Sequence, residues 1–169
     1  MFYINLDEIL SLMAPKILIV YGSLTGNTEK IAKLIAQGVE EAGGEVTVRK
    51  VEDAGLQELT EADGIILGSP THYGGMCAEM KRFIYETDKV HGKLAGKLGA
   101  AFTSSCGDGD DTTLTSLIQA MLIHGMLVMG GPKARRCYTY GISVIGKPTR
   151  EGEEMCKALG KRMVEFLKH

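Results

Sequence analysis

The stretch Lys16–Thr28 constrains the fold more than any other part of the chain. It begins with Lys-Ile-Leu-Ile-Val-Tyr, a short apolar run typical of a parallel strand buried on both faces. A loop of glycine and hydroxyl residues follows, and helical periodicity begins at Glu29. A strand, a loop and a helix in this order place backbone N–H groups and a positive helix end against an anion. The stretch therefore predicts a phosphate site.

The charge balance argues against nucleic acid as a partner. Lysine and arginine number 19 and aspartate and glutamate 21, so the net charge is −2, which gives no electrostatic case for binding nucleic acid or an acidic membrane surface. No apolar run is long enough to span a bilayer, and the N-terminus carries no basic leader. We expect a single domain with no membrane span.

The cysteines give no sign of a metal site. The chain has four, Cys77, Cys106, Cys137 and Cys156, and no two of them lie at Cys-x-x-Cys spacing. Zinc binding and dithiol redox chemistry are therefore not indicated, and we predict no metal. Because nothing points to a disulfide framework, we expect a reduced, cytoplasmic setting.

Strands and helices alternate along the chain, which predicts an α/β fold. We expect a doubly wound parallel sheet of five strands in the order 2-1-3-4-5, with helices on both faces. The connection 52–63 is expected to hold one helical turn, and 132–150 is expected to be irregular. The expected strands are 16–21, 45–51, 64–69, 97–104 and 125–131, and the expected helices are 28–42, 78–88, 111–124 and one from 149 or 150 onward.

Residues 1–15 precede the first strand and are treated as an N-terminal extension of the domain 16–169. Asn5 and Glu8 could form a capping pair for a short helix. Its apolar stripe must be covered, either by its own domain or by a neighbouring subunit. The stripe consists of Ile9, Leu10, Leu12 and Met13.

Three loops should converge where the first, third and fourth strands end, at the switch point of the sheet. The first loop, 23–28, has three hydroxyls and an amide in six positions. A tight turn with Asn27 or Thr28 as the helix cap would explain one of these donors but not all four. The loop has neither the Walker order nor the Gly-x-Gly-x-x-Gly order, which disfavours ATP hydrolysis and a Rossmann NAD site.

Two of these loops resemble those of a known superfamily. Ser-Leu-Thr-Gly-Asn-Thr, residues 23–28, resembles the phosphate loop of flavodoxins. Pro-Thr-His-Tyr-Gly-Gly-Met, residues 70–76, is similar to a loop of WrbA-type NAD(P)H:quinone oxidoreductases, a branch of the same superfamily. The similarity covers most of the chain from Lys16 onward. It leaves out the residues before Lys16 and departs in 132–150, which is shorter than in the WrbA-type enzymes.

The resemblance implies an FMN cofactor held by the three loops. The first loop would bind the phosphate, the second would line the isoalloxazine ring with Tyr73 as its aromatic neighbour, and the third would bind the pyrimidine end and the ribityl chain. A flat amphipathic ring needs such an apolar wall and polar edge. The cofactor-binding residues would be Ser23, Leu24, Thr25, Gly26, Asn27, Thr28, Pro70, Thr71, His72, Tyr73, Gly74, Gly75, Ser104, Ser105, Cys106, Gly107 and Gly109.

The sequence leaves two possible roles open for several individual residues. Tyr73 is either an exposed ring neighbour or a packing tyrosine. His72 either bonds the flavin or a quinone or faces solvent. His124 either caps a helix as an imidazolium or approaches the flavin, as in the WrbA-type pattern. Cys106 is weak evidence for redox chemistry. Three aspartates, Asp108, Asp110 and Asp111, are better explained by N-capping than by a cation site.

Two functions follow from the resemblance. The first is an FMN-dependent oxidoreductase that transfers electrons from NAD(P)H to a quinone or similar small acceptor, with no protein nucleophile. The second is an electron carrier between redox proteins. Carriers of that kind are strongly acidic, which steers them to basic partners, and this chain is nearly neutral. A flavin-binding sensor or assembly subunit is a third option. We expect a homo-oligomer, either a dimer or a tetramer.

Overall fold

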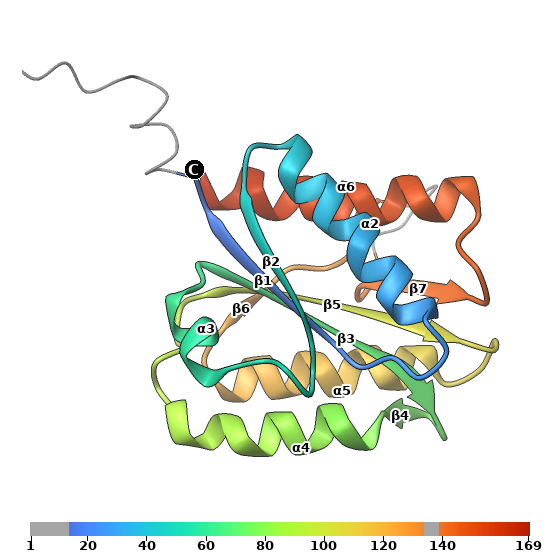
Figure 1. Ribbon diagram of the computed structural model, residues 1–169, viewed down its shortest axis with the longest axis horizontal. Coiled ribbons are helices and arrows are strands. Elements are labelled where there is room, and N and C mark those ends of the chain that lie inside the picture. The colour runs from blue at the N-terminus through green and yellow to red at the C-terminus, as the bar shows by residue number, and fades with distance from the viewer. Residues whose placement is uncertain (1–13, 134–138) are drawn as a thin grey trace, which may run out of the picture.

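The computed structural model describes residues 14–133 and 139–169, which form three layers (Figure 1). A twisted parallel sheet lies in the middle, with α2 and α6 on one face and α3, α4 and α5 on the other. The expected order 2-1-3-4-5 is confirmed, and appears as β2-β1-β3-β5-β6 because a short hairpin strand takes the label β4. The main strands are β1 (Lys16–Tyr21), β2 (Glu45–Lys50), β3 (Gly64–His72), β5 (Leu98–Ser105) and β6 (Leu127–Val128).

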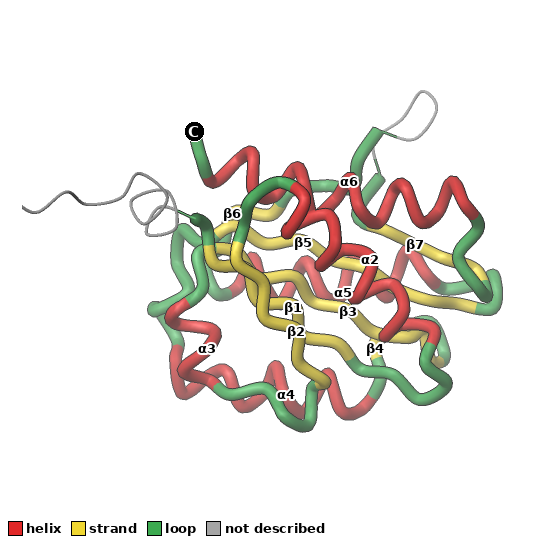
Figure 2. The backbone as a smooth tube through the Cα atoms, turned by 45° about the horizontal axis from the view of Figure 1, so that its top comes forward, coloured by secondary structure: helices red, strands yellow, loops and turns green. Residues whose placement is uncertain are grey.

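The helices connect successive strands as right-handed crossovers require. Figure 2 shows them as separate segments on the two sides of the sheet. The connection after β2 holds a six-residue helix, which is longer than the single turn expected. The helices are α2 (Asn27–Glu41), α3 (Leu56–Glu61), α4 (Ala78–Glu86), α5 (Asp110–Ile123) and α6 (Arg150–Leu167), with a 3₁₀ turn at Thr87–Val90. The helix expected in the N-terminal extension falls in 1–13, outside the described residues.

The core follows from the apolar run in β1. Residues Ile17 to Tyr21 are buried, because β1 lies between β2 and β3 and is covered by helices on both faces. Ile19, at its centre, pairs with Val48 of β2 and Ile66 of β3. β2 is only half-buried, as expected for an edge strand. Within the described residues, no helix combines the length and the apolar character that crossing a membrane requires.

Two short strands share the last position of the sheet. β6 pairs with the start of β5, and β7 (Ile142–Ile145) pairs with its end. The expectation of one strand over 125–131 and an irregular 132–150 is therefore wrong in part. The chain leaves the sheet after Val128 and returns at Ile142. Between these strands Gly131 and Gly141 lie so close that a Cβ on Gly131 would be 2.6 Å from the Gly141 carbonyl oxygen.

Two large apolar side chains of the helices that cover the sheet are exposed. Leu122 of α5 is 54% exposed and Phe166 of α6 is 58% exposed. In each helix the row that faces the core runs through other positions: Leu117 and Met121 in α5, Leu159 and Met163 in α6. Leu122 directly follows Met121 and is turned by about 100° from it, whereas Phe166 lies at the edge of the row formed by Leu159 and Met163, in the last turn of α6.

Two glycines allow α2 and α6 to pack closely. A Cβ on Gly160 would overlap the backbone carbonyl of Ile35, and a Cβ on Gly38 would overlap the backbone of Lys157. Backbone atoms cannot move aside as a flexible side chain can. The helix crossing therefore depends on the absence of side chains at these two positions.

We expect Gly160→Ala to lower the free energy of unfolding by about 1–3 kcal/mol, because overpacking outweighs the better helix propensity of alanine. Gly152→Ala, in the first turn of the same helix, is the control. Its added Cβ would meet Thr149 Oγ1 only at 3.6 Å, so we expect stability to be unchanged or raised by up to about 1 kcal/mol. Urea unfolding measures the stability of both variants. Equal changes in the free energy of unfolding for Gly160→Ala and Gly152→Ala would contradict the packing argument.

Candidate functional site

Three loops meet at the carboxyl ends of β1, β3 and β5, on the right of Figure 1. The three strands are neighbours in the sheet, and their ends are in register. The Gly22 N–H donates to the Gly68 carbonyl at 2.9 Å, and Pro70 of β3 lies opposite Ser104 of β5. The convergence expected from the sequence is present in the structure.

The first loop presents backbone donors at the start of α2. Its N-cap is Gly26, with a φ of 87°, and no side chain caps the helix. Asn27 and Thr28, which the competing interpretation made the helix cap, are instead the first two residues of the helix, because Gly26 adopts the left-handed conformation that ends the loop. The first helical bond runs from the Lys30 N–H to the Gly26 carbonyl at 3.0 Å. The three N–H groups of residues 27–29 therefore have no acceptor within the helix.

The side chains of this loop differ in where they point. Leu24 and Thr25 are exposed, and Ser23 Oγ accepts the Gly26 N–H at 3.1 Å. Thr28 is 1% exposed, and its hydroxyl is 2.8 Å from Ser104 Oγ. The hydroxyl of Thr28 thus has an internal partner on β5, whereas that of Thr25 is open to a ligand.

The second loop is a hairpin, not the open loop expected over 70–76. β3 continues to His72, and the chain turns at Tyr73 and Gly74 and returns as β4 (Gly75–Met76). The two turn residues have φ values of 50° and 76°, as a type I′ turn requires. Tyr73 is fully exposed, so it does not pack against the described part of the chain. A tyrosine with positive φ is uncommon and marks this turn as a candidate functional position.

Buried hydroxyls hold the hairpin in place. Ser69 Oγ accepts the Cys77 N–H and donates to the Pro70 carbonyl, both at 2.8 Å. Thr103 of β5 donates to the Ser69 carbonyl at 2.7 Å, and Thr71 Oγ1 lies 3.0 Å from Thr103 Oγ1. No local signal in the sequence marks Ser69 and Thr103 as functional, because a serine or threonine at a strand end gives no sign of a bond to a distant strand.

The third loop packs against the hairpin. Ser104 and Ser105 are buried in β5, and Cys106 and Gly107 are exposed after it. A Cβ on Gly109 would be 2.7 Å from the Gly74 Cα, so the two loops can approach this closely only because position 109 is glycine. The last residue before α5 is therefore constrained by contact with the second loop.

The expected N-capping of α5 by an aspartate is wrong. Gly109 is the N-cap, in a left-handed conformation and without a side-chain cap. Asp110 and Asp111 lie in the first turn, where carboxylates favour the positive helix end. Asp110 Oδ2 accepts from Ser143 Oγ of β7 at 2.5 Å. No cluster of His, Cys, Asp and Glu side chains suited to a metal ion occurs in the described part of the chain.

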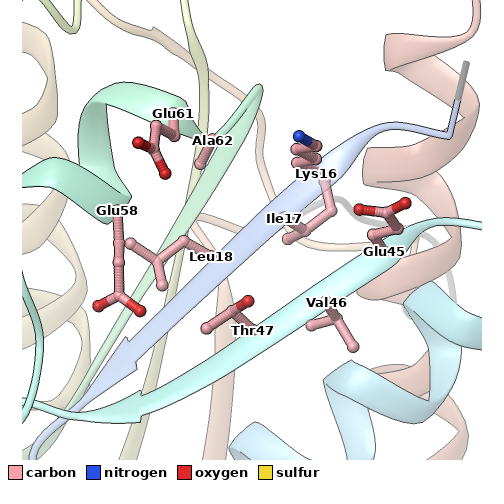
Figure 3. A pocket seen from close by; sticks show the side chains of 9 residues that line it. All are labelled: Lys16, Ile17, Leu18, Glu45, Val46, Thr47, Glu58, Glu61 and Ala62. Atoms are coloured by element: carbon pink, nitrogen blue, oxygen red, sulfur yellow. The ribbon is translucent and has the colours of Figure 1, made fainter. Parts of the chain in front are cut away.

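Two cavities differ in their position relative to the three loops. One of about 170 Å³ separates the first loop from the hairpin, and His72, Lys50 and Glu79 contribute to its walls. His72 is thus exposed between the first loop and the hairpin. The other, of about 320 Å³, lies at the amino ends of β1 and β2 beside α3 (Figure 3), and includes Glu45, Glu58 and Glu61. It is remote from the loops.

His124 lies at the opposite end of the sheet from the loops. It ends α5 immediately before Gly125, whose carbonyl accepts the Gly96 N–H just ahead of β5. Its Nε2 donates to Thr87 Oγ1 at 2.7 Å, because Thr87 gives its own proton to the Ile84 carbonyl. Burial, followed by the neighbouring His91, lowers the pKa of His124 below 6.5. His124 is thus the C-cap residue of α5, as one interpretation expected, but its lowered pKa disfavours the imidazolium form. Within this chain it does not approach the loops.

This pKa predicts a pH dependence of stability. Because the folded pKa of His124 is lowered, the unfolded chain takes up a proton first as the pH falls below about 6.5. We expect the free energy of unfolding to decrease from pH 7 to pH 5, and His124→Gln to weaken that decrease. His72→Gln, at the exposed turn, is the control. Urea unfolding between pH 7 and pH 5 measures this dependence. If the free energy of unfolding decreases equally in the wild type and in His124→Gln, the pH dependence does not come from His124.

Comparison with known proteins identifies the family. The flavodoxin domain family matches residues 18–122, which include all three loops. The chain belongs to the flavodoxin family. A protein named NAD(P)H dehydrogenase (quinone) from Archaeoglobus fulgidus is 36% identical, covering 89% of this chain and 96% of its own. A protein named flavodoxin from Aquifex aeolicus is also 36% identical, covering 90% of this chain and 86% of its own.

Solved structures agree with this family assignment. A flavodoxin described as a WrbA-like protein from Agrobacterium tumefaciens superimposes with a TM-score of 0.79 at 25% sequence identity. The superposition covers 91% of this chain and 98% of that one. The resemblance to WrbA-type members of the flavodoxin family is thus supported by sequence and by fold.

Proposed function

We propose that this flavodoxin-family chain is an FMN-binding oxidoreductase that transfers electrons from NAD(P)H to a quinone or similar acceptor. The observation that carries the proposal is the uncapped start of α2, which presents the N–H groups of Asn27, Thr28 and Glu29 at the edge where three loops meet. The family membership and the relative named NAD(P)H dehydrogenase (quinone) support it.

The residues of the first loop fit a phosphate group. Gly26 is exposed and has no atom within 4 Å of the position of a Cβ, so an anion could reach the backbone. The hydroxyl of Thr25 is open to it, and the helix end adds partial positive charge. In our proposal the phosphate is held by neutral donors, and Glu29 is paired with Lys33 at 2.5 Å, which reduces its repulsion of the phosphate.

Exposed side chains of the first loop and the hairpin, together with the backbone of the third loop, fit a flat ring. Tyr73 and Leu24 are large apolar side chains exposed at the tips of the hairpin and the first loop, where they offer a wall to an aromatic ligand. The backbone at Cys106 and Gly107 is exposed on the third loop and supplies a polar edge. When bound, the flavin would supply the redox chemistry, while the protein binds and orients it and excludes water. His72 would be a neighbour of the acceptor.

A second function, that of an electron carrier between redox proteins, is favoured by one specific observation. The relative from Aquifex aeolicus is named flavodoxin and is as similar to this chain as the relative named dehydrogenase. The nearly neutral charge of this chain favours the oxidoreductase, because carriers depend on charge to find their partners. A cytoplasmic location and a homo-oligomeric assembly belong to the same proposal.

The phosphate site can be tested at Thr25. We expect Thr25→Val to weaken FMN binding roughly 10- to 150-fold, because a hydrogen bond to a charged group contributes about 1.5–3 kcal/mol. Thr60→Val is the control, since Thr60 lies on α3 and donates to the Gln57 carbonyl. Fluorescence titration of FMN measures both affinities. An unchanged affinity in Thr25→Val would place the phosphate elsewhere.

Thr28→Val should behave differently. It removes the partner of Ser104, so we expect it to lower stability by about 1–3 kcal/mol as well as to weaken FMN binding. Measuring unfolding without FMN separates the two effects.

The choice between the two functions rests on the electron donor. We expect NADH or NADPH to bleach the flavin absorbance of the FMN-loaded protein directly in stopped-flow mixing, and a benzoquinone to restore it. Chemical reduction with dithionite is the control, because it shows that the bound flavin can be reduced and that its bleaching can be detected. If dithionite bleaches the flavin and neither nucleotide does, the oxidoreductase proposal fails and the carrier remains.

A further inference from the structure

An apolar patch is exposed at the end of the sheet opposite to the three loops. Leu127 of β6 is 64% exposed and Phe166 of α6 is 58% exposed, and Leu98 and Leu167 lie half-buried beside them. We call these four residues the amino-end patch. Soluble monomers seldom leave several large apolar side chains uncovered at one place, so we expect another segment or another chain to cover this patch.

Two sets of contacts, between β5 and β6 and between α6 and the segment after β6, bring the members of the patch near one another. Leu127 pairs with Leu98 at the start of β5. Arg162 Nη1 donates to the Gly131 carbonyl at 2.6 Å, three residues after β6 ends, and its guanidinium lies 5.8 Å from the centre of the Phe166 ring. The side of α6 that carries Arg162 and Phe166 therefore adjoins the segment that follows β6.

The patch lies on the α6 side of the sheet. Val128 packs in the opposite core, with α5, whereas Met129 belongs to the core beneath α6. Because side chains alternate along a strand, Leu127 points to the same side as Met129. Leu98 also packs against the core beneath α6. One occupant could therefore cover all four side chains at once.

The described chain begins next to this patch. The Pro15 carbonyl accepts the Glu45 N–H at 2.9 Å, and the Lys16 carbonyl accepts the Asp63 N–H at 2.8 Å. A Cβ on Gly64 would contact both Ile17 of β1 and Leu167 of the patch. Figure 1 shows the start of β1 beside the C-terminal end of α6. Residues 1–13 are thus joined to the sheet at the end where the patch lies.

The composition and length of residues 1–13 suit this surface. Nine of the thirteen are apolar, and the charged side chains are Asp7 and Glu8. Arg162 lies over the ring of Phe166 in the patch, where its positive charge would complement Asp7 and Glu8. From β1 to β6 there are three strand spacings, or about 14 Å, and thirteen residues span about 20 Å even as a helix. The segment can reach the patch without leaving its own domain.

We propose that residues 1–13 dock on the amino-end patch of their own chain and cover Leu127 and Phe166. The segment then serves as an intramolecular cover for the edge of the sheet. It does not join subunits, and it leaves the three loops open. This inference is independent of the flavin site.

A tryptophan in the segment tests the proposal, since the sequence contains none. In Leu10→Trp we expect acrylamide to quench the emission about threefold less efficiently than in the free amino acid, because a docked indole is shielded from water. Adding Leu127→Lys and Phe166→Lys should restore full quenching. Both sites are exposed, and circular dichroism shows whether the variants remain folded.

The control variant carries Leu10→Trp with Tyr85→Lys, because Tyr85 is exposed on α4, across the sheet. It should leave the shielding unchanged. All variants are compared in the same cofactor state and over a range of concentrations, with mass measured by light scattering. Full quenching in Leu10→Trp alone, shielding that survives the two patch substitutions, or shielding that appears only with a dimer would each overturn the proposal. The last outcome would assign the patch to a second copy.

Discussion

The hydrogen bond between Thr28 and Ser104 is the interaction on which the arrangement of the site depends. Thr28 is in the first turn of α2 and Ser104 is near the end of β5, so the bond ties the start of a helix to a strand that is not its neighbour in the chain. Both hydroxyls are buried, and each would be costly to leave without a partner. Their pairing places the uncapped N–H groups of α2 at the edge of the sheet where the loops meet.

The hairpin shows the same dependence on buried polar groups. Ser69 and Thr103 are fully buried, and between them they satisfy backbone groups of the turn and join β3 to β5. Tyr73 can then remain exposed in a backbone conformation that tyrosine seldom adopts. Polar side chains inside the sheet therefore support an apolar side chain outside it, which is the arrangement that a flat ligand between loops requires.

The two ends of the sheet have different roles. At the carboxyl ends, glycines and hydroxyls leave backbone groups accessible and suit ligand binding. At the amino ends, the contacts of His124 with Thr87 and of Arg162 with Gly131 are structural. The proposed cover by residues 1–13 would complete that second end. Substitutions at the amino ends should therefore affect stability, whereas those in the loops should affect the binding of the cofactor and, at Thr28, stability as well.

The sequence by itself determined the layers, the strand order and the position of the three loops, because apolar runs, helical periodicity and glycine-rich strand ends are local signals. Only the tertiary structure decided which donors are free. Thr25 and Thr28 look alike in the sequence, but only Thr28 meets a distant hydroxyl. The strand at Ile142–Ile145, the glycine caps Gly26 and Gly109, and the exposure of Leu122 likewise depend on which distant segments come into contact. Such contacts form between residues far apart in the chain, and no local pattern of residues specifies them.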